Sequence, residues 1–163
     1  MSNLDKAAVR RELEAAWAEL RALVESLPEG ELEQPGVVDG WSVKDLLGHI
    51  AFWTGKAAND LRAVAAGRVD EVLTPGDEAG VDDWNAREAE RRRDLSLKEV
   101  HDEWRKSFDE ARAALEAVPA EALDVEVKGW TMAVRFAEDT YKHYHEHAEH
   151  IRAWQRQLET TEA

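Results

Sequence analysis

The chain has 163 residues, of which 44% are hydrophobic and 34% are charged, and this composition is typical of a folded globular protein rather than a disordered one. It contains no cysteine, which excludes disulfides and thiolate nucleophiles and leaves histidine and carboxylate side chains as the metal ligands available. The net charge of −14 disfavours duplex DNA and anionic membranes, which repel an acidic surface. We therefore expect no nucleic-acid partner and no membrane partner. Met1 leads directly into a polar segment, and no run approaches the ~20 apolar residues of a membrane span, so a cytoplasmic protein is expected.

The first two helices are predicted by apolar residues at helical spacing and by signals at their ends. Residues Leu4–Leu27 carry one apolar stripe, and Pro28 ends it. The second helix, Ser42–Ala66, begins with Ser42 and Asp45 in the order of a capping box. In a capping box each side chain accepts a hydrogen bond from the backbone N–H of the other residue, so this pair marks a helix start.

A long loop and a short helix separate the second long helix from the third. The loop leads to a short helix around Val81–Arg92. The third long helix, Ser96–Val118, opens with another capping box, and Pro119 closes it. The fourth, Met132–Leu158, is predicted to be one helix, and the sequence VEVKGW just before it allows a short extended stretch.

Four long amphipathic helices without a strand pattern predict an all-α protein. The most economical architecture is a four-helix bundle with a long loop and a short extra helix between helices two and three. The chain contains no internal repeat, low-complexity tract or domain linker, so residues 1–163 are expected to form a single domain.

The segment TYKHYHEHAEHI, residues 140–151, holds four of the six histidines. His143 and His147 lie one turn apart on one edge of the apolar stripe of the fourth helix. His49 lies at the margin of the stripe of the second helix. A His-x-x-x-His pair and a third imidazole from a facing helix form a three-ligand site with open positions for water or substrate. His49, His143 and His147 are therefore candidate metal ligands.

A plainer interpretation applies to the same residues. An acidic protein can carry several histidines on a solvated helix face, and the His-x-x-x-His pattern alone is common. His49 alone is equally consistent with a structural role. Of the other histidines, His150 continues the same edge outward, His145 points to the opposite margin, and His101 lies on the third long helix beside its apolar face. We expect all three to be dispensable for metal binding. Trp41, just before the second helix, is expected to pack as a hydrophobic staple.

Two segments resemble the signature segments of the DinB-like superfamily of four-helix bundles. They are GWSVKDLLGHIAFW, residues 40–53, and DTYKHYHEHAEHIRAW, residues 139–154. The most similar branch is the ClbS/DfsB type, and the mycothiol- and bacillithiol-dependent transferases are more distant relatives. The resemblance implies a divalent metal, zinc or nickel, bound by His49, His143 and His147. Glu146 is an alternative ligand, because some of these transferases use a carboxylate, although it points further from the core.

The resemblance also implies a class of function. It suggests a metal-dependent hydrolase, or an S-transferase that uses a low-molecular-weight thiol, acting on a small electrophilic molecule in detoxification or self-resistance. The alternative is a bundle that binds and sequesters a small molecule without turnover, and DinB-like bundles also pair as homodimers. Trp53 and Tyr144 are candidates for the apolar wall of the pocket, with simple core packing as the plainer role.

Two carboxylates are placed to orient the candidate ligands. Asp139 precedes His143 by one helical turn, and Asp45 precedes His49 by one turn. A carboxylate that accepts a hydrogen bond from the free ring nitrogen fixes the orientation of a metal-binding imidazole. Asp45 is also expected to take part in the capping box, so its carboxylate has two possible uses.

Overall fold

A computed structural model describes residues 5–162, so the expected helix start at Leu4 lies outside the described residues. Six α-helices follow one another in this part of the chain: α1 (Lys6–Glu25), α2 (Val43–Ala65), α3 (Val81–Arg92), α4 (Leu97–Ala117), α5 (Met132–Asp139) and α6 (Tyr141–Glu162). Three short 3-10 turns lie at Glu29–Glu31, Val69–Glu71 and Ala120–Asp124. Across residues 5–162 no helix is long and apolar enough to cross a membrane.

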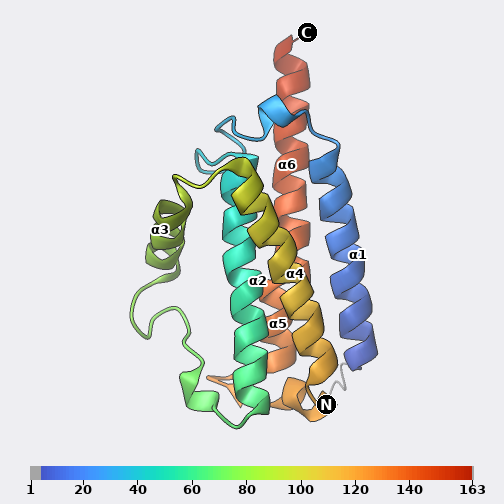
Figure 1. The fold of residues 1–163 in the computed structure, drawn as a ribbon, viewed down its shortest axis with the longest axis vertical. Coiled ribbons are helices and arrows are strands. Elements are labelled where there is room, and N and C mark those ends of the chain that lie inside the picture. The colour runs from blue at the N-terminus through green and yellow to red at the C-terminus, as the bar shows by residue number, and fades with distance from the viewer. Residues whose placement is uncertain (1–4, 163) are drawn as a thin grey trace.

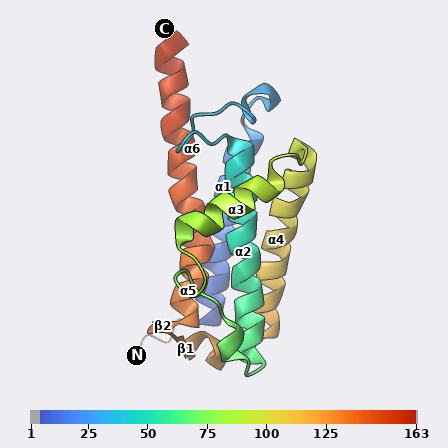
Figure 2. The same cartoon turned by 90° about the vertical axis from the view of Figure 1, so that its left-hand side faces the viewer.

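The long helices run side by side along the long axis of the molecule, and α5 and α6 together form the fourth member of the bundle (Figure 1). The short helix α3 lies outside the bundle, next to α2, and Figure 2 shows it crossing the face of that helix. The apolar faces meet in one hydrophobic cluster, in which the Trp17 ring stacks on Phe108 with ring centroids 4.4 Å apart. The predicted all-α bundle, with a loop and an extra helix between the second and third long helices, is confirmed.

Both predicted capping boxes form. The Ser42 backbone N–H donates to the Asp45 carboxylate at 2.9 Å, and the Asp45 N–H donates to the Ser42 hydroxyl at 3.2 Å. Ser96 and Glu99 form the same pair of hydrogen bonds at the start of α4. These boxes fix the first turn of each helix and therefore the direction in which every later side chain of the helix points.

The fourth helix differs from its prediction as one uninterrupted helix. It breaks at Thr140, whose backbone (φ −123°, ψ −100°) lies outside the helical region, so α5 and α6 are separate elements. The buried Thr140 hydroxyl donates to the Phe136 carbonyl at 2.5 Å. A threonine hydroxyl can compete with the backbone for a carbonyl one turn earlier and bend a helix in this way. Apolar spacing on both sides of the break continues, which is why the sequence pattern did not reveal it.

The short extended stretch in VEVKGW is a β-hairpin at one end of the bundle (Figure 2). Strands β1 (Glu126–Val127) and β2 (Trp130–Thr131) pair antiparallel. The two turn residues, Lys128 and Gly129, have φ values of +50° and +82°. Positive φ at both central residues is the requirement of a type I′ hairpin turn, and glycine adopts it without strain.

Helix α3 is held against the bundle by a buried arginine. The Arg92 Nε donates to Glu103 of α4 at 2.7 Å, and its Nη1 donates to Glu88 of α3 at 2.7 Å. The aliphatic part of Arg92 lies over Gly48 of α2, where an added Cβ would come within 2.8 Å of the Arg92 Cδ. Gly48 therefore lets α3 approach α2 closely, and this approach places α3 as one wall of the site described next.

Candidate metal centre

The imidazole rings of His49, His143 and His147 converge on one point between α2 and α6. The Nε2 of His143 lies 2.9 Å from the Nε2 of His49 and 2.9 Å from the Nε2 of His147. One nitrogen from each ring lies within 4.8 Å of those of the other two. The structure therefore brings together the three residues predicted from the sequence, and their spacing permits a metal site.

Burial keeps these three imidazoles neutral. It lowers the pKa of His49 to about 4, with Arg92 contributing, and lowers the pKa of His147 to about 3. Burial also lowers the pKa of His143 well below its ordinary value, and the neighbouring imidazoles add to this effect. Neutral imidazole nitrogen is the form that binds a metal.

The donor set fits a divalent ion. Two ligands bound at ~2.0 to 2.1 Å in tetrahedral geometry lie ~3.3 Å apart, close to the Nε2 separations described above. A separation of 2.9 Å is also the length of an N–H···N hydrogen bond between neutral tautomers, so this spacing permits an ion without requiring one.

The second ring nitrogens have unequal surroundings. The Nδ1 of His147 lies 3.2 Å from the Nδ1 of His150, so His150 is placed to orient that ring. The buried Nδ1 of His143 has no hydrogen-bond partner within residues 5–162. The prediction that Asp139 orients His143 is wrong, because the break at Thr140 removes the regular helical spacing between them. The predicted role of Asp45 toward His49 is also not seen, since its side chain is engaged by Ser42 in the capping box described above.

The remaining candidate residues lie as follows. His145 is exposed, 3.4 Å from a Glu19 oxygen, and His101 packs against the Trp104 ring, with centroids 5.3 Å apart. Both are remote from the converging rings, as expected. Glu146 is exposed beside the site and does not belong to the group of three converging ligands. His150 contacts the His147 ring, a neighbour that its spacing of three residues on the helix could have indicated, and its dispensability for metal binding stays a prediction.

A cleft of about 710 Å³ opens beside the three histidines and runs between α2, α3, α5 and the loop after α2. Trp53 lines it, as predicted, and its Nε1 donates to Asn85 of α3 at 2.9 Å. Tyr144 is instead buried in the core, where its hydroxyl shares a hydrogen bond of 3.0 Å with Thr54. Trp41, predicted to pack as a hydrophobic staple, also lines the cleft and packs edge-on against His49, with ring centroids 5.2 Å apart.

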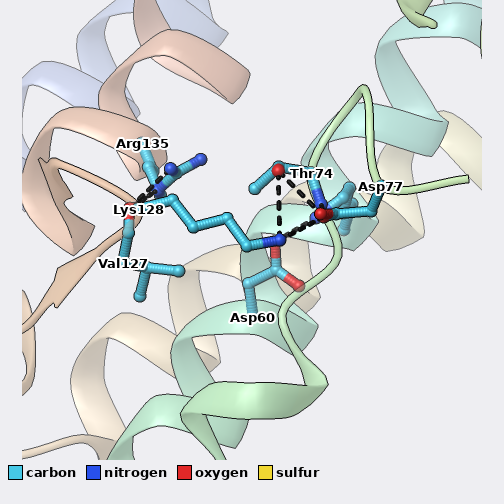
Figure 3. A network of polar contacts seen from close by, with 7 residues as sticks. Asp60, Thr74, Asp77, Val127, Lys128 and Arg135 are labelled. Carbon is cyan, nitrogen blue, oxygen red and sulfur yellow. Dashed lines mark hydrogen bonds and ion pairs between the residues drawn. The ribbon is translucent and has the colours of Figure 1, made fainter. Parts of the chain in front are cut away.

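Charged side chains line the end of the cleft away from the histidines. Lys56 and Asp60, one turn apart on α2, form a half-buried ion pair. Arg135 of α5 donates from Nε and Nη2 to the Val127 carbonyl at 3.0 and 2.6 Å, and Figure 3 shows the guanidinium turned toward that carbonyl. Asp139 has no hydrogen-bond partner within residues 5–162, and burial raises its pKa to about 7. The cleft thus holds an unpaired, half-buried carboxyl group.

Two segments far apart in the sequence close the outer wall of the cleft. Lys128, at the tip of the hairpin, reaches across to Asp77 and to the hydroxyl of Thr74 in the loop after α2 (Figure 3). The Lys128 ammonium, together with the backbone and hydroxyl of Thr74, lowers the pKa of Asp77 to about 2. This contact joins the loop to the hairpin and brings Thr74 and Trp130 to the same cleft.

The bundle and its converging histidines define a class of helical protein with a site that permits a metal. The chain belongs to the family of the mycothiol maleylpyruvate isomerase N-terminal domain, whose model matches residues 13–153. This family is DinB-like, so the predicted superfamily is confirmed. No curated protein matches the chain in sequence.

Solved structures with the same fold cover nearly the whole chain. An uncharacterised protein from Escherichia coli UTI89 is 16% identical with a TM-score of 0.76, and the match covers 94% of each chain. The colibactin self-resistance protein ClbS, in complex with a dsDNA, is 14% identical with a TM-score of 0.79, covering 93% of this chain and 95% of ClbS. DfsB, described as a sibling lethal factor precursor, is 16% identical with a TM-score of 0.79, covering 95% and 97%. At sequence identities this low, the structural similarity establishes a shared fold and nothing about a shared function.

The comparison with ClbS corrects one expectation. The prediction that net charge excludes nucleic-acid partners is wrong, because a protein of the same fold is seen in complex with dsDNA. Net charge sums the whole surface, whereas a nucleic acid is bound by a local set of side chains. An acidic total of −14 therefore does not decide the question for this fold.

Proposed function

We propose that this chain binds one divalent metal ion, zinc or nickel, through the Nε2 atoms of His49, His143 and His147, and acts on a small electrophilic molecule in the adjacent cleft. The observation that carries the proposal is the convergence of three neutral imidazole nitrogens at the inner end of a cleft. A bound ion would supply Lewis acidity, which lowers the pKa of a coordinated water or thiol.

The protein residues around the ligands have separate tasks in this proposal. Burial holds the three imidazoles neutral, so that no proton competes for their lone pairs at pH 7. His150 fixes the ring of His147 through its Nδ1, and the edge of Trp41 restricts the ring of His49. Three neutral ligands leave the full positive charge of an ion in place and leave a position open, which favours a catalytic site over a closed structural one.

The cleft supports a small molecule as the substrate. A volume of about 710 Å³ lies in the range of small-molecule sites, and its walls combine tryptophan rings with a few polar groups. Since the chain has no cysteine, a thiol nucleophile must come from a low-molecular-weight cosubstrate. Hydrolysis with water and transfer to such a thiol are the two reactions that fit, and sequestration without turnover is the alternative.

The test is a turnover assay with the metal-loaded, untagged protein. Small epoxides and activated double bonds serve as electrophiles, with and without mycothiol or bacillithiol. Turnover without a thiol identifies a hydrolase, turnover only with a thiol identifies a transferase, and tight binding without turnover identifies a sequestering protein. Activity is expected to disappear in His49→Ala and His147→Ala and to persist in the control His145→Ala. Activity that survives both ligand substitutions would contradict the proposed site.

A further inference from the structure

The mouth of the cleft is unusually apolar for an exposed surface. Within the described part of the chain, the large hydrophobic side chains that remain exposed are Leu73 (41%), Val81 (43%) and Trp130 (57%). All three line this cleft, although they come from the loop, from α3 and from the hairpin. Exposed apolar groups gathered at one concave site indicate a ligand with an apolar body.

The charge of the cleft is strongly one-sided. Two basic side chains line it: Lys56 is paired with Asp60, whereas Arg135 donates to the neutral Val127 carbonyl and keeps an unpaired charge among residues 5–162. Six acidic side chains line it as well: Asp39, Asp60, Asp82, Glu138, Asp139 and Glu146. Four of these make no ion pair with any residue in the range 5–162: Asp39, Asp82, Asp139 and Glu146. In the metal-free protein, four unpaired carboxylates therefore face one unpaired guanidinium, so the charge of the cleft attracts a cation and repels an anion.

Asp139 is a half-buried member of this group, and it lines the cleft without a hydrogen-bond partner among residues 5–162. Its carboxyl group lies near Lys56, Asp60 and Arg135, whose charges act on it in opposite directions. A half-buried carboxylate that has no hydrogen bond from the protein is partly shielded from water, which is unfavourable for its charged form. A ligand that supplies a positively charged donor at this position removes that cost.

We propose that the cleft selects organic cations, molecules with a protonated amine and an aromatic or aliphatic body. The amine binds at Asp139, and the apolar body lies against Trp41, Trp53 and Trp130. Indole faces attract cations as well as apolar groups, so the walls and the carboxylates favour the same ligand class. The proposal names a substrate class for the site described under Proposed function. It rests on that proposed function in one respect: the bound cation is taken to be the substrate.

The experiment compares three small probes with the same phenyl body and different charge: 2-phenylethylamine, 2-phenylethanol and 3-phenylpropionate. Binding to metal-free protein at pH 8 is followed by NMR through the indole N–H signals, so that coordination of the amine to a metal makes no contribution. We expect the amine to bind at least ~10-fold more tightly than the alcohol and the carboxylate to bind most weakly, because a desolvated ion pair is worth more than a factor of ten. The signals of the cleft tryptophans should shift, and that of the buried Trp104 should not. Equal affinities, or a preference for the carboxylate, would overturn the proposal.

Two matched variants separate a local contact from long-range attraction. Asp139→Asn removes the carboxylate in the cleft and should abolish the preference for the amine. Asp94→Asn changes the net charge equally at a side chain that is 95% exposed and does not line the cleft, so it should keep the preference. An Asp139→Asn protein that still prefers the amine contradicts the assignment of this residue.

Failure of this proposal is distinguishable from failure of the proposed function. The metal content of each protein is measured on the same samples by elemental analysis. Metal bound without amine selectivity leaves the metal centre standing and removes the substrate class. Amine selectivity in a protein that binds no metal leaves the cation site standing and removes the metal centre.

Discussion

Replacing Asp139 by asparagine should stabilise the metal-free protein at neutral pH, although it removes a charged residue from an acidic cleft. Burial raises the pKa of this carboxyl group from its ordinary 3.8 to about 7. The folded protein therefore binds a proton at Asp139 more tightly than the unfolded chain does, and the contribution of Asp139 to stability falls as the pH rises from about 4 to about 7. A pKa difference of this size lowers the free energy of unfolding by about 4 kcal/mol at pH 8. Contact of the carboxylate with water in the open cleft reduces this effect to about 2 to 4 kcal/mol.

Asparagine keeps the shape of the side chain and has no charge to bury. The gain in the free energy of unfolding should therefore be largest at pH 8 and close to zero at pH 4, where aspartate is protonated in the folded protein. Urea denaturation at both pH values, after removal of metal with a chelator, measures this difference. The groups that act on Asp139 are Lys56, Asp60, Arg135 and Glu138, and they are unchanged by the substitution. A gain that is equal at both pH values, or a loss of stability at pH 8, would refute the reasoning.

Two further predictions concern burial and close packing. In the metal-free protein, the stability contributed by His49 and His147 should fall as the pH falls from about 6.5 toward about 4, because both stay neutral in the folded protein while the unfolded chain takes up protons. Urea denaturation at pH 7 and pH 5 should show this loss, reduced in His147→Ala, and an identical loss in the variant would contradict it. Gly48→Ala should destabilise the protein by about 1 to 3 kcal/mol, since its Cβ would lie 2.8 Å from the Arg92 Cδ. The control Gly55→Ala, with no atom within 4 Å of its Cβ, should gain about 0.5 to 1 kcal/mol, and equal effects in thermal denaturation would contradict the packing argument.

Much of the fold is predictable from the sequence because its signals are local. The capping box of Ser42 and Asp45 fixes where α2 begins, and the helical period then fixes the direction of His49. The same period places His143 and His147 on one edge of α6, since both lie beyond the break in the fourth helix. The convergence of three rings from two helices follows from these local directions once the apolar faces are packed together.

The parts that were missed depend on contacts that local spacing does not encode. The break at Thr140 arises because a side-chain hydroxyl competes for a backbone carbonyl, which apolar periodicity cannot reveal. The outer wall of the cleft depends on the contact of Lys128 with Asp77, two residues that are 51 positions apart. Trp41 reaches the cleft because the chain before α2 folds back onto the site.

The central claim is that His49, His143 and His147 hold one metal ion. The most direct measurement is the ratio of metal to protein, determined by elemental analysis on protein purified without a histidine tag and then equilibrated with zinc or nickel. We predict about one ion per chain for the unchanged protein and for His145→Ala, and almost none for His49→Ala and His147→Ala. Absence of bound metal in the unchanged protein, or a full equivalent retained by both ligand variants, would contradict the account.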